Sequence, residues 1–245
     1  MKADFFALYD ALADDVVSSE RIESAQLGAR WALVETAQSS GMAMFTQGAT
    51  VKPFYTKLEG LALSEAAKAV KSWNLEEASL SLAACNAFYN TPDRIETLGV
   101  YAPLDVFYTD GIDLRGMTVA LIGHMHGPKE LREQAKAVYT LERAPQTGDY
   151  PDSACDWILP RCDLVIITGS ALINKTLPHL LALSRNAITI LTGPSVPLCP
   201  ALLDFGIDRI AGMAVTDRAA LRERVVRGLR GSPYGEGMPF ILKKE

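Results

Sequence analysis

Short apolar runs, each followed by small or polar residues, recur through the second half of the chain. The clearest runs cover residues 118–122, 164–168 and 188–191. A strand that is buried on both faces reads as a continuous apolar run, and a parallel sheet of such strands places its binding loops at the strands' carboxyl ends. The pattern therefore predicts a binding site on the loops that follow these strands, before the residues indicate any ligand.

From residue 117 onward, the hydrophobic pattern alternates between strand and helix. We expect strands at 118–122, 137–141, 164–168, 187–191 and 208–213. We expect helices at about 128–136, 152–159, 176–184, 200–205 and 217–229. Strands that alternate with helices imply right-handed βαβ crossovers and a parallel sheet covered on both faces. The fold class is therefore α/β, with a Rossmann-like parallel sheet in this half.

The first half has a different pattern, which is typical of a small α+β unit. Its short apolar runs lie at 22–27, 31–36 and 42–45. Gly28 and Gly41 separate these runs, which favours an antiparallel meander with a hairpin turn at 39–41.

Helices are expected on both sides of this meander. Residues 4–19 carry one apolar stripe and predict the first helix. Ser64 is a good N-cap for a second helix. A third helix, over 75–87, should end before Pro92, which cannot continue it.

A connector with several prolines and glycines, residues 91–115, separates the two patterns. We therefore expect a small α+β domain at 1–110 and a Rossmann-like domain at 111–245.

The composition is that of a globular protein, with 49% hydrophobic and 22% charged residues. No apolar run approaches the ~20 residues needed to cross a bilayer. The first residues lead directly into acidic positions and do not resemble a signal peptide, so we expect a cytoplasmic protein. The four cysteines show no paired spacing and should be thiols in a reducing compartment; they are Cys85, Cys155, Cys162 and Cys199.

The charge is unevenly distributed. The formal net charge is −5, which argues against a nucleic-acid partner. Residues 1–110 hold 8 basic and 15 acidic side chains (−7), whereas residues 111–245 hold 16 basic and 14 acidic ones (+2). The asymmetry supports two units, of which the second suits an anionic ligand better. Two solvated surfaces of different composition would explain it equally well.

The loop after the first strand of the α/β half has the sequence Gly123-His124-Met125-His126-Gly127. A glycine here lets the backbone turn sharply, so that the amides of the next helix favour an anion. The full dinucleotide fingerprint is missing because Met125 occupies a glycine position. Glu142 nevertheless ends the next strand, about where a Rossmann acid contacts ribose hydroxyls. Adenosine-type binding is one interpretation; a Rossmann-like loop adapted to another ligand is the alternative.

His124 and His126 are two of only three histidines in the chain. Neutral imidazole is the commonest nitrogen ligand of transition metals, and side chains two residues apart can converge in a turn. The pair therefore suggests contact with a metal or a metal complex. Hydrogen-bonded loop histidines are the alternative.

Polar residues at the ends of other predicted strands extend this candidate site. Thr168 and Asn174 follow a central strand and can orient a ligand, although Asn174 suits equally well as the cap of the next helix. Ser195 lies in a proline-rich, rigid loop and could donate to an anion. Cys155 and Cys162 are interpreted as core thiols.

Together these residues resemble the domain family of unknown function described as "putative heavy-metal chelation". The matching pieces are Ile122-Gly123-His124, Glu142-Arg143, Gly148-Asp149-Tyr150-Pro151, and residues 166–174, 193–198, 205–208 and 211–212. The first half is similar to the amino-terminal domain of enolase, with residues 84–90 matching the helix end that faces the second domain.

The resemblance implies a ligand cleft between the two domains. Asn86 and Asn90 would line it from the small domain. The other side would be formed by Gly123, His124, Glu142, Thr168, Asn174 and Ser195. No enolase chemistry is implied, because the enolase barrel and its metal carboxylates have no counterpart in this sequence.

Three functions follow from these patterns. The first is binding of a metal ion or a small metal-chelating molecule, with His124 and His126 as metal contacts. The second is an enzyme that uses an adenosine-type cofactor, a nucleotide or S-adenosylmethionine, with Glu142 on the ribose. The third is a scaffold whose cleft has lost its ligand. We expect a small-molecule or metal partner and no nucleic-acid or membrane partner. A homo-oligomer is compatible with the sequence.

Overall fold

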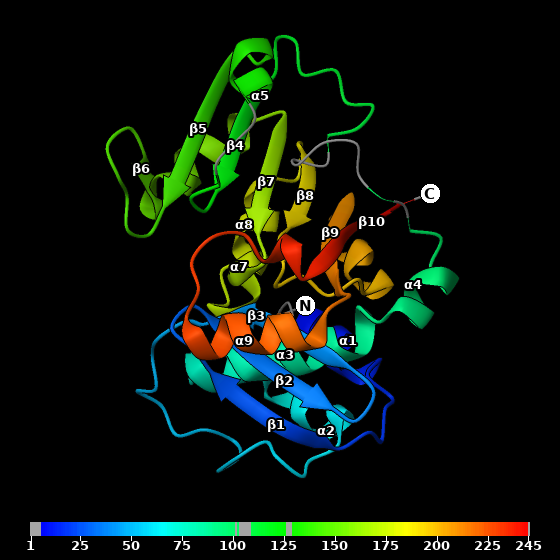
Figure 1. The fold of residues 1–245 in the computed structure, drawn as a ribbon. Helices are drawn as coiled ribbons and strands as arrows, with labels where there is room; N and C mark the ends of the chain where they lie inside the picture. The colour runs from blue at the N-terminus through cyan, green and yellow to red at the C-terminus, as the bar shows by residue number, and fades with distance from the viewer. Residues whose placement is uncertain (1–5, 101, 103–108, 126–128, 245) are drawn as a thin grey trace.

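Two β-sheets, one of three strands and one of seven, organise the chain in the computed structural model (Figure 1). The structure describes residues 6–100, 102, 109–125 and 129–244. The expected α/β architecture is confirmed, because six strands of the larger sheet run parallel and alternate with helices.

The smaller sheet is the predicted antiparallel meander. It consists of β1 (Ile22–Leu27), β2 (Trp31–Thr36) and β3 (Ser40–Met44). Gly41 lies inside β3 rather than in the turn. A Cβ atom at Gly41 would lie 2.1 Å from the carbonyl oxygen of Ala83 and the amide nitrogen of Ala87. Glycine is therefore needed there for close packing of the strand on a helix.

Four α-helices accompany this sheet. They are α1 (Ala7–Asp14), α2 (Leu63–Ala66), α3 (Leu75–Tyr89) and α4 (Pro92–Thr97), and a 3₁₀ turn, η1, covers Ala67–Lys71. Ser64 lies within α2 and does not cap it; instead, the Glu65 carboxylate accepts a hydrogen bond from the amide of Ala62, 2.9 Å away. The third helix, α3, ends at Tyr89 and so before Pro92, as expected; Pro92 itself begins α4, because its fixed φ suits a first helical turn.

The larger sheet has the strand order β10-β9-β8-β7-β4-β5-β6. Its strands are β4 (Thr118–Ile122), β5 (Ala137–Glu142), β6 (Tyr150–Pro151), β7 (Leu164–Thr168), β8 (Ile188–Thr192), β9 (Arg209–Val215) and β10 (Gly237–Lys243). The sequence pattern missed β10, which pairs antiparallel with β9 at the sheet edge. Pro239 within it is compatible with an edge strand, where one backbone amide needs no partner.

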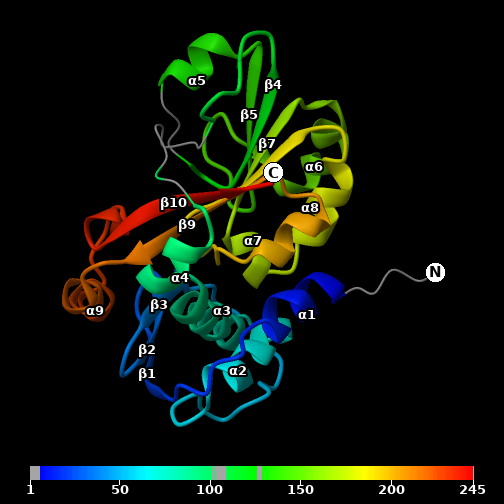
Figure 2. The same cartoon turned by 90° about the vertical axis from the view of Figure 1, so that its right-hand side faces the viewer.

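Short helices surround this sheet (Figure 2). The α-helices are α5 (Lys129–Gln134), α6 (Cys155–Ile158), α7 (Ser170–Ile173), α8 (Leu177–Leu183) and α9 (Arg218–Arg227). The 3₁₀ turns are η2 (Asp152–Ala154), η3 (Leu159–Arg161), η4 (Pro200–Phe205) and η5 (Pro233–Gly235). The helix expected over 152–159 is thus divided into three short pieces. Among the described residues, no helix has the length and apolar character required to cross a bilayer.

The two halves share buried apolar side chains. One cluster joins Leu82 of α3 with Ile167, Ile173 and Leu198 of the second half. The α9 helix, drawn in orange in Figure 1, lies over the small sheet, where Leu221 packs in a second cluster with residues of β2 and β3. The boundary at residue 110 therefore stays a prediction, because apolar packing continues across it.

Candidate functional site

A pocket lies where the carboxyl ends of β4, β5 and β7 meet, and its volume is about 250 Å³. The parallel sheet changes direction between β4 and β7, since β4 is followed in the chain by β5 on one side and β7 on the other. Open α/β sheets bind ligands at such a switch point. The lining residues are Ile122, Gly123, Leu141, Glu142, Arg143, Asp152, Ser153, Cys155, Asp156, Thr168, Ser170, Ala171, Asn174, Thr176, His179 and Leu180. Four of the predicted site residues are among them: Gly123, Glu142, Thr168 and Asn174.

Gly123 brings the end of β4 against the end of β7. Its φ is +102°, a left-handed conformation that favours glycine. A Cβ atom there would lie 2.9 Å from Cγ2 of Thr168. The glycine is therefore required both by its backbone conformation and by the close approach of the two strand ends.

Glu142 holds the turn above the pocket. Its Oε2 accepts a hydrogen bond from the backbone amide of His124 at 2.7 Å, and its Oε1 accepts one from the amide of Arg143 at 2.8 Å. A carboxylate has about four acceptor positions, so two of them remain for a ligand. Glu142 thus contacts the loop that follows Gly123 directly.

His124 is oriented by a carboxylate from the loop that follows β5. Its Nδ1 lies 3.1 Å from Oδ2 of Asp149, and the same oxygen accepts a hydrogen bond from the amide of Gln146. The hydrogen bond from Gln146, followed by that from His124, lowers the pKa of Asp149 below its ordinary value. A proton on Nδ1 leaves Nε2 as the imidazole acceptor, the arrangement in which histidine binds metals. His124 stands beside the pocket and does not line it.

Thr168 and Asn174 present polar groups to the pocket. The Oδ1 of Asn174 accepts hydrogen bonds from the amide and the hydroxyl of Thr176, at 3.1 and 2.6 Å. Its Nδ2 has no hydrogen-bond partner in the described part of the chain. The Oγ1 of Thr168 accepts from the hydroxyl of Ser170 at 3.3 Å. The capping and ligand-contact interpretations of Asn174 are therefore compatible, because different atoms serve each.

The structure adds lining residues that sequence reasoning did not assign to the site. Nε2 of His179 lies 3.2 Å from Oδ1 of Asp156, and Nε of Arg143 lies 3.4 Å from Oδ2 of Asp152. His179 and Asp156 are 23 positions apart in the chain, and Arg143 and Asp152 are 9 apart. No spacing in the sequence indicates the pair of His179 and Asp156. Three carboxylates and one arginine line the pocket, so its rim is acidic although this half of the chain is net basic.

Cys155 is a further addition. Its side chain is buried, as expected for a core thiol, but it also lines the pocket. Burial, with the nearby carboxylates of Asp152 and Asp156, raises the pKa of Cys155 to about 11.

Three predicted residues lie away from this pocket. Nδ2 of Asn86 donates to the carbonyl of Met42 at 2.7 Å, and the amide of Met44 donates to Oγ of Ser195 at 2.7 Å. Asn90 donates to the carbonyls of Val196 and Met213, at 2.9 and 3.1 Å, and accepts from the amide of Leu198 at 2.8 Å. All three side chains are buried.

The contacts of Asn90 and Ser195 join the two halves of the chain through backbone groups, whereas that of Asn86 lies within the first half. The structure therefore does not bring Asn86, Asn90 and Ser195 together with Glu142 and the other lining residues in one hollow. Every residue that lines the described pocket belongs to the second half, so this pocket is not the cleft lined from both halves that the resemblance implies.

Metal ligation has a restricted donor set. His126 lies outside the described residues. Among those described, no three histidine, cysteine, aspartate or glutamate side chains lie close enough to hold one metal ion. A bare ion would therefore lack a complete set of donors from this part of the protein, since structural sites commonly supply four.

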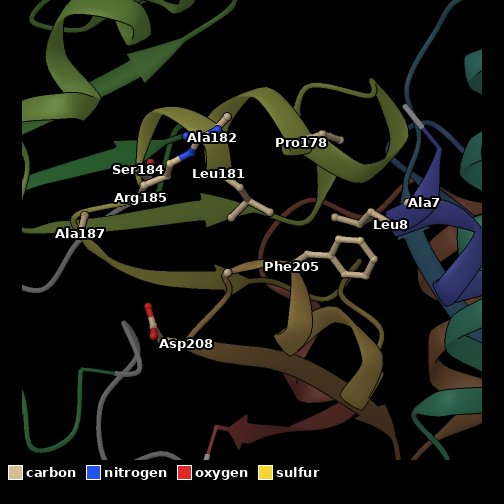
Figure 3. Close-up of a pocket in the computed structure, with 11 residues that line it drawn as sticks. Ala7, Leu8, Pro178, Leu181, Ala182, Ser184, Arg185, Ala187, Phe205 and Asp208 are labelled. Atoms are coloured by element: carbon tan, nitrogen blue, oxygen red, sulfur yellow. The ribbon is translucent and has the colours of Figure 1, made fainter. Parts of the chain in front are cut away.

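Two other cavities hold little of the predicted site. One, of about 440 Å³, lies between α1, α8 and η4 (Figure 3). Phe205, Leu8 and Leu181 form its apolar side, and it contains none of the predicted residues. Another, of about 340 Å³, lies between the β2–β3 turn and the end of β9, and Asn90 alone of the predicted residues lines it.

Family models match most of the chain. A model named DUF364, described as "Putative heavy-metal chelation", matches residues 107–239. A second model with the same description, DUF4213, matches residues 9–89. An uncharacterized protein of Methanocaldococcus jannaschii is 30% identical over 162 residues, and the match spans 63% of this chain and 61% of that protein.

Solved structures show the same fold. A protein of unknown function from the DUF364 family of Desulfitobacterium hafniense DCB-2 is 34% identical, with a TM-score of 0.86 over 98% of this chain and 99% of that one. A DUF364 protein of unknown function from Pyrococcus horikoshii is 22% identical, with a TM-score of 0.78 over 97% of this chain and 100% of that one. The resemblance of the first half to enolase stays a prediction.

Proposed function

The chain belongs to the DUF364 family, and on that premise we propose that it binds a small metal-chelating molecule, or the metal complex of one, in the pocket at the ends of β4, β5 and β7. The single observation that carries the proposal is the convergence of Gly123, Glu142, Thr168 and Asn174 on one pocket at the switch point of the sheet. The description of the family supplies the chemical class of the ligand.

The polar groups of the pocket suit an organic ligand. Nδ2 of Asn174 and the hydroxyl of Thr168 can donate hydrogen bonds to a ligand's oxygen atoms, and Glu142 can accept from its N–H or O–H groups. Apolar side chains such as Ile122 and Leu180 line the same space. Ligand sites commonly combine an apolar lining with a few placed polar groups.

The donor set favours a complexed metal over a bare ion. Within the described residues the protein offers pairs such as His179 with Asp156, and no group of three. A metal that arrives with most of its coordination positions filled needs only one or two donors from the protein. His124, oriented by Asp149, is a candidate for one of them.

Calorimetric titration tests this proposal. The purified protein is titrated with Ni(II), Co(II), Cu(II) and Zn(II), each as the free ion and as its 1:1 glycinate complex, which has a charge of +1. We expect a complex to bind and Asn174→Ser to weaken that binding, because serine keeps an acceptor for the Thr176 amide but removes the Nδ2 donor. If Asn174→Ser and Thr168→Val each bind the complex with the same affinity as the wild type, the proposal is contradicted.

Asn90→Ala is the matched control. Asn90 is also an asparagine of the predicted site, but its hydrogen bonds are made to backbone groups and to the side chain of Asn86 inside the protein. Its removal should lower thermal stability and leave affinity for the complex unchanged. His124→Ala separately tests the metal contact, since it should weaken binding of the complex more than binding of metal-free chelator.

A second candidate function rests on the contact between Glu142 and the amide of His124. This contact places an acid beside the first glycine turn, as in enzymes that bind an adenosine-type cofactor. The volume of about 250 Å³ is small for a whole dinucleotide. Thermal shifts with nucleotides and S-adenosylmethionine that disappear in Glu142→Ala would favour this candidate.

A further inference from the structure

Cys155 differs from the other cysteines in its surroundings. All four are buried, but Cys155 alone lines the pocket described above. Its side chain is 4% exposed. No hydrogen-bond partner is found for its thiol within the described residues, whereas the Cys162 thiol donates to the carbonyl of Ile158 at 3.3 Å.

The thiol lies in an acidic part of the pocket. Asp152 and Asp156 flank it in the chain, line the same space and act on it electrostatically. Glu142 adds a third carboxylate, and Arg143, paired with Asp152, is the one arginine of the lining. Carboxylates attract cations, and a thiol is the softest donor that a protein offers to a metal. An unpartnered buried thiol and an acidic rim are two independent features of one pocket, and both favour the same ligand.

We propose that the pocket takes a positively charged complex of a thiophilic metal and that Cys155 fills an open coordination position of that metal. This inference rests on the proposed function and names the metal class and the protein donor. A hard cation such as Mg²⁺ is excluded from this role, because it prefers oxygen donors. Because no group of three donor side chains is found within the described chain, the other ligands of the metal come from the complex itself.

The bond changes balance for a metal with a single open position. The aqua cation CH₃Hg(OH₂)⁺, which forms in mildly acidic, chloride-free solution, reacts with the thiol so that the S–H and Hg–OH₂ bonds break and the S–Hg bond forms. The displaced water leaves, the thiol proton passes to the solvent, and no oxidant or reductant is needed. Methylmercury is therefore a suitable probe, since its cation is small, positively charged and thiophilic.

The experiment compares the labelling rates of cysteines in the full-length, reduced protein. Substoichiometric methylmercury is added, and peptide mass mapping locates the metal. Cys162 is the matched control, because it is 5% exposed and burial raises its pKa to about 11, as for Cys155, yet it lies outside the pocket lining. We expect Cys155 to be labelled about 10-fold faster or more, since a cleft of one charge sign concentrates the opposite ion.

Charge variants separate attraction from simple access. The double change of Asp152→Asn and Asp156→Asn should slow the methylmercury cation at Cys155. The neutral alkylating agent iodoacetamide should react there as fast or faster, because the two carboxylates that raise the pKa of the thiol are gone. Equal rates at Cys155 and Cys162 in the wild type, which needs no substitution, would overturn the proposal. An equal preference for Cys155 with both reagents would also overturn it, because access alone would then explain the labelling.

Cys155→Ser separates this inference from the proposed function. If the glycinate complexes bind wild type and Cys155→Ser equally, the pocket function stands and Cys155 is not a donor. If Asn174→Ser does not weaken binding but methylmercury still selects Cys155, the thiol site stands without the proposed chelate function. Cys162→Ser should behave as wild type in both assays, and circular dichroism verifies that each variant is folded.

Discussion

Nζ of Lys175 lies 5.5 Å from the centroid of the Tyr9 ring. Lys175 follows the end of α7 in the second half, and Tyr9 lies in α1, the first helix of the chain. Both side chains are buried, and the Tyr9 hydroxyl has no hydrogen-bond partner among the residues that the structure describes. The ammonium donates to the carbonyl of Ile173 at 2.7 Å. Lys175 also has a φ of +65°, which is unusual for a residue with a side chain. A buried amine thus stabilises the end of α7 directly after the pocket residue Asn174.

Burial lowers the pKa of Lys175 from 10.5 to about 8, because the charged form loses solvation. Between these two values the unfolded chain binds more protons than the folded one, so stability should rise as the pH increases from 8 to 10.5. Lys175→Met removes the buried charge but leaves the Ile173 carbonyl unpaired. We expect Lys175→Met to be more stable by about 2 kcal/mol at pH 7.

Urea unfolding at several pH values checks this prediction. The wild type should gain stability between pH 8 and 10.5, and the Lys175→Met variant should gain less over that interval. The same pH dependence in both proteins would show that other groups cause it.

Gly123→Ala should be destabilising by about 2 kcal/mol or more, because alanine at a φ of +102° is strained and its Cβ contacts Thr168. Gly231→Ala is the control, since its φ of +96° is similar but a Cβ there meets no atom within 4 Å. The difference in free energy of unfolding between the two variants measures the contact between the strand ends. If the two changes cost the same, the contact with Thr168 has no energetic effect.

Arg222 and Glu35 form a bidentate pair between α9 and β2, with N–O distances of 2.8 and 2.9 Å. Glu35 is buried, whereas the Arg222 side chain is 53% exposed. Arg222→Ala leaves a buried carboxylate without its partner and should cost about 2 kcal/mol, less than for a fully buried pair.

Arg227→Ala provides a control on the same helix. The Arg227–Glu223 pair is exposed on both sides, so its loss should cost less than about 0.5 kcal/mol. Thermal unfolding of both variants at low and high salt measures the difference. A loss for Arg222→Ala as small as that for Arg227→Ala would mean that Glu35 regains solvent in the variant.

Asn90→Ala should lower the free energy of unfolding by about 2 kcal/mol or more, because it leaves the carbonyls of Val196 and Met213 and the amide of Leu198 without their partner. Asn90→Asp is informative beside it, since the carboxylate retains the acceptor for Leu198 but loses both donors. Denaturant unfolding should place Asn90→Asp at or below the stability of Asn90→Ala. A neutral effect of both changes would contradict the structural role of Asn90.

The sequence predicted the parallel sheet well, because each central strand is buried on both faces and therefore reads as an apolar run. It missed β10, where Gly237 and Pro239 weaken the strand pattern and the antiparallel partner lies about 25 residues away in the chain. It also placed Gly41 in a turn, because the packing of β3 on α3 that requires a glycine is a contact between distant segments.

By itself, the sequence determined which side chains could form a site on the loops after the parallel strands. Local order and strand ends place Gly123, Glu142, Thr168 and Asn174, since parallel strands bring their carboxyl ends to one edge. Only the tertiary structure decided that Asn90 and Ser195 are buried in contacts between the halves, and that Cys155 lines the pocket. Those outcomes depend on how separate elements pack. The spacing of residues along the chain does not indicate which polar atoms from distant segments form hydrogen bonds with one another.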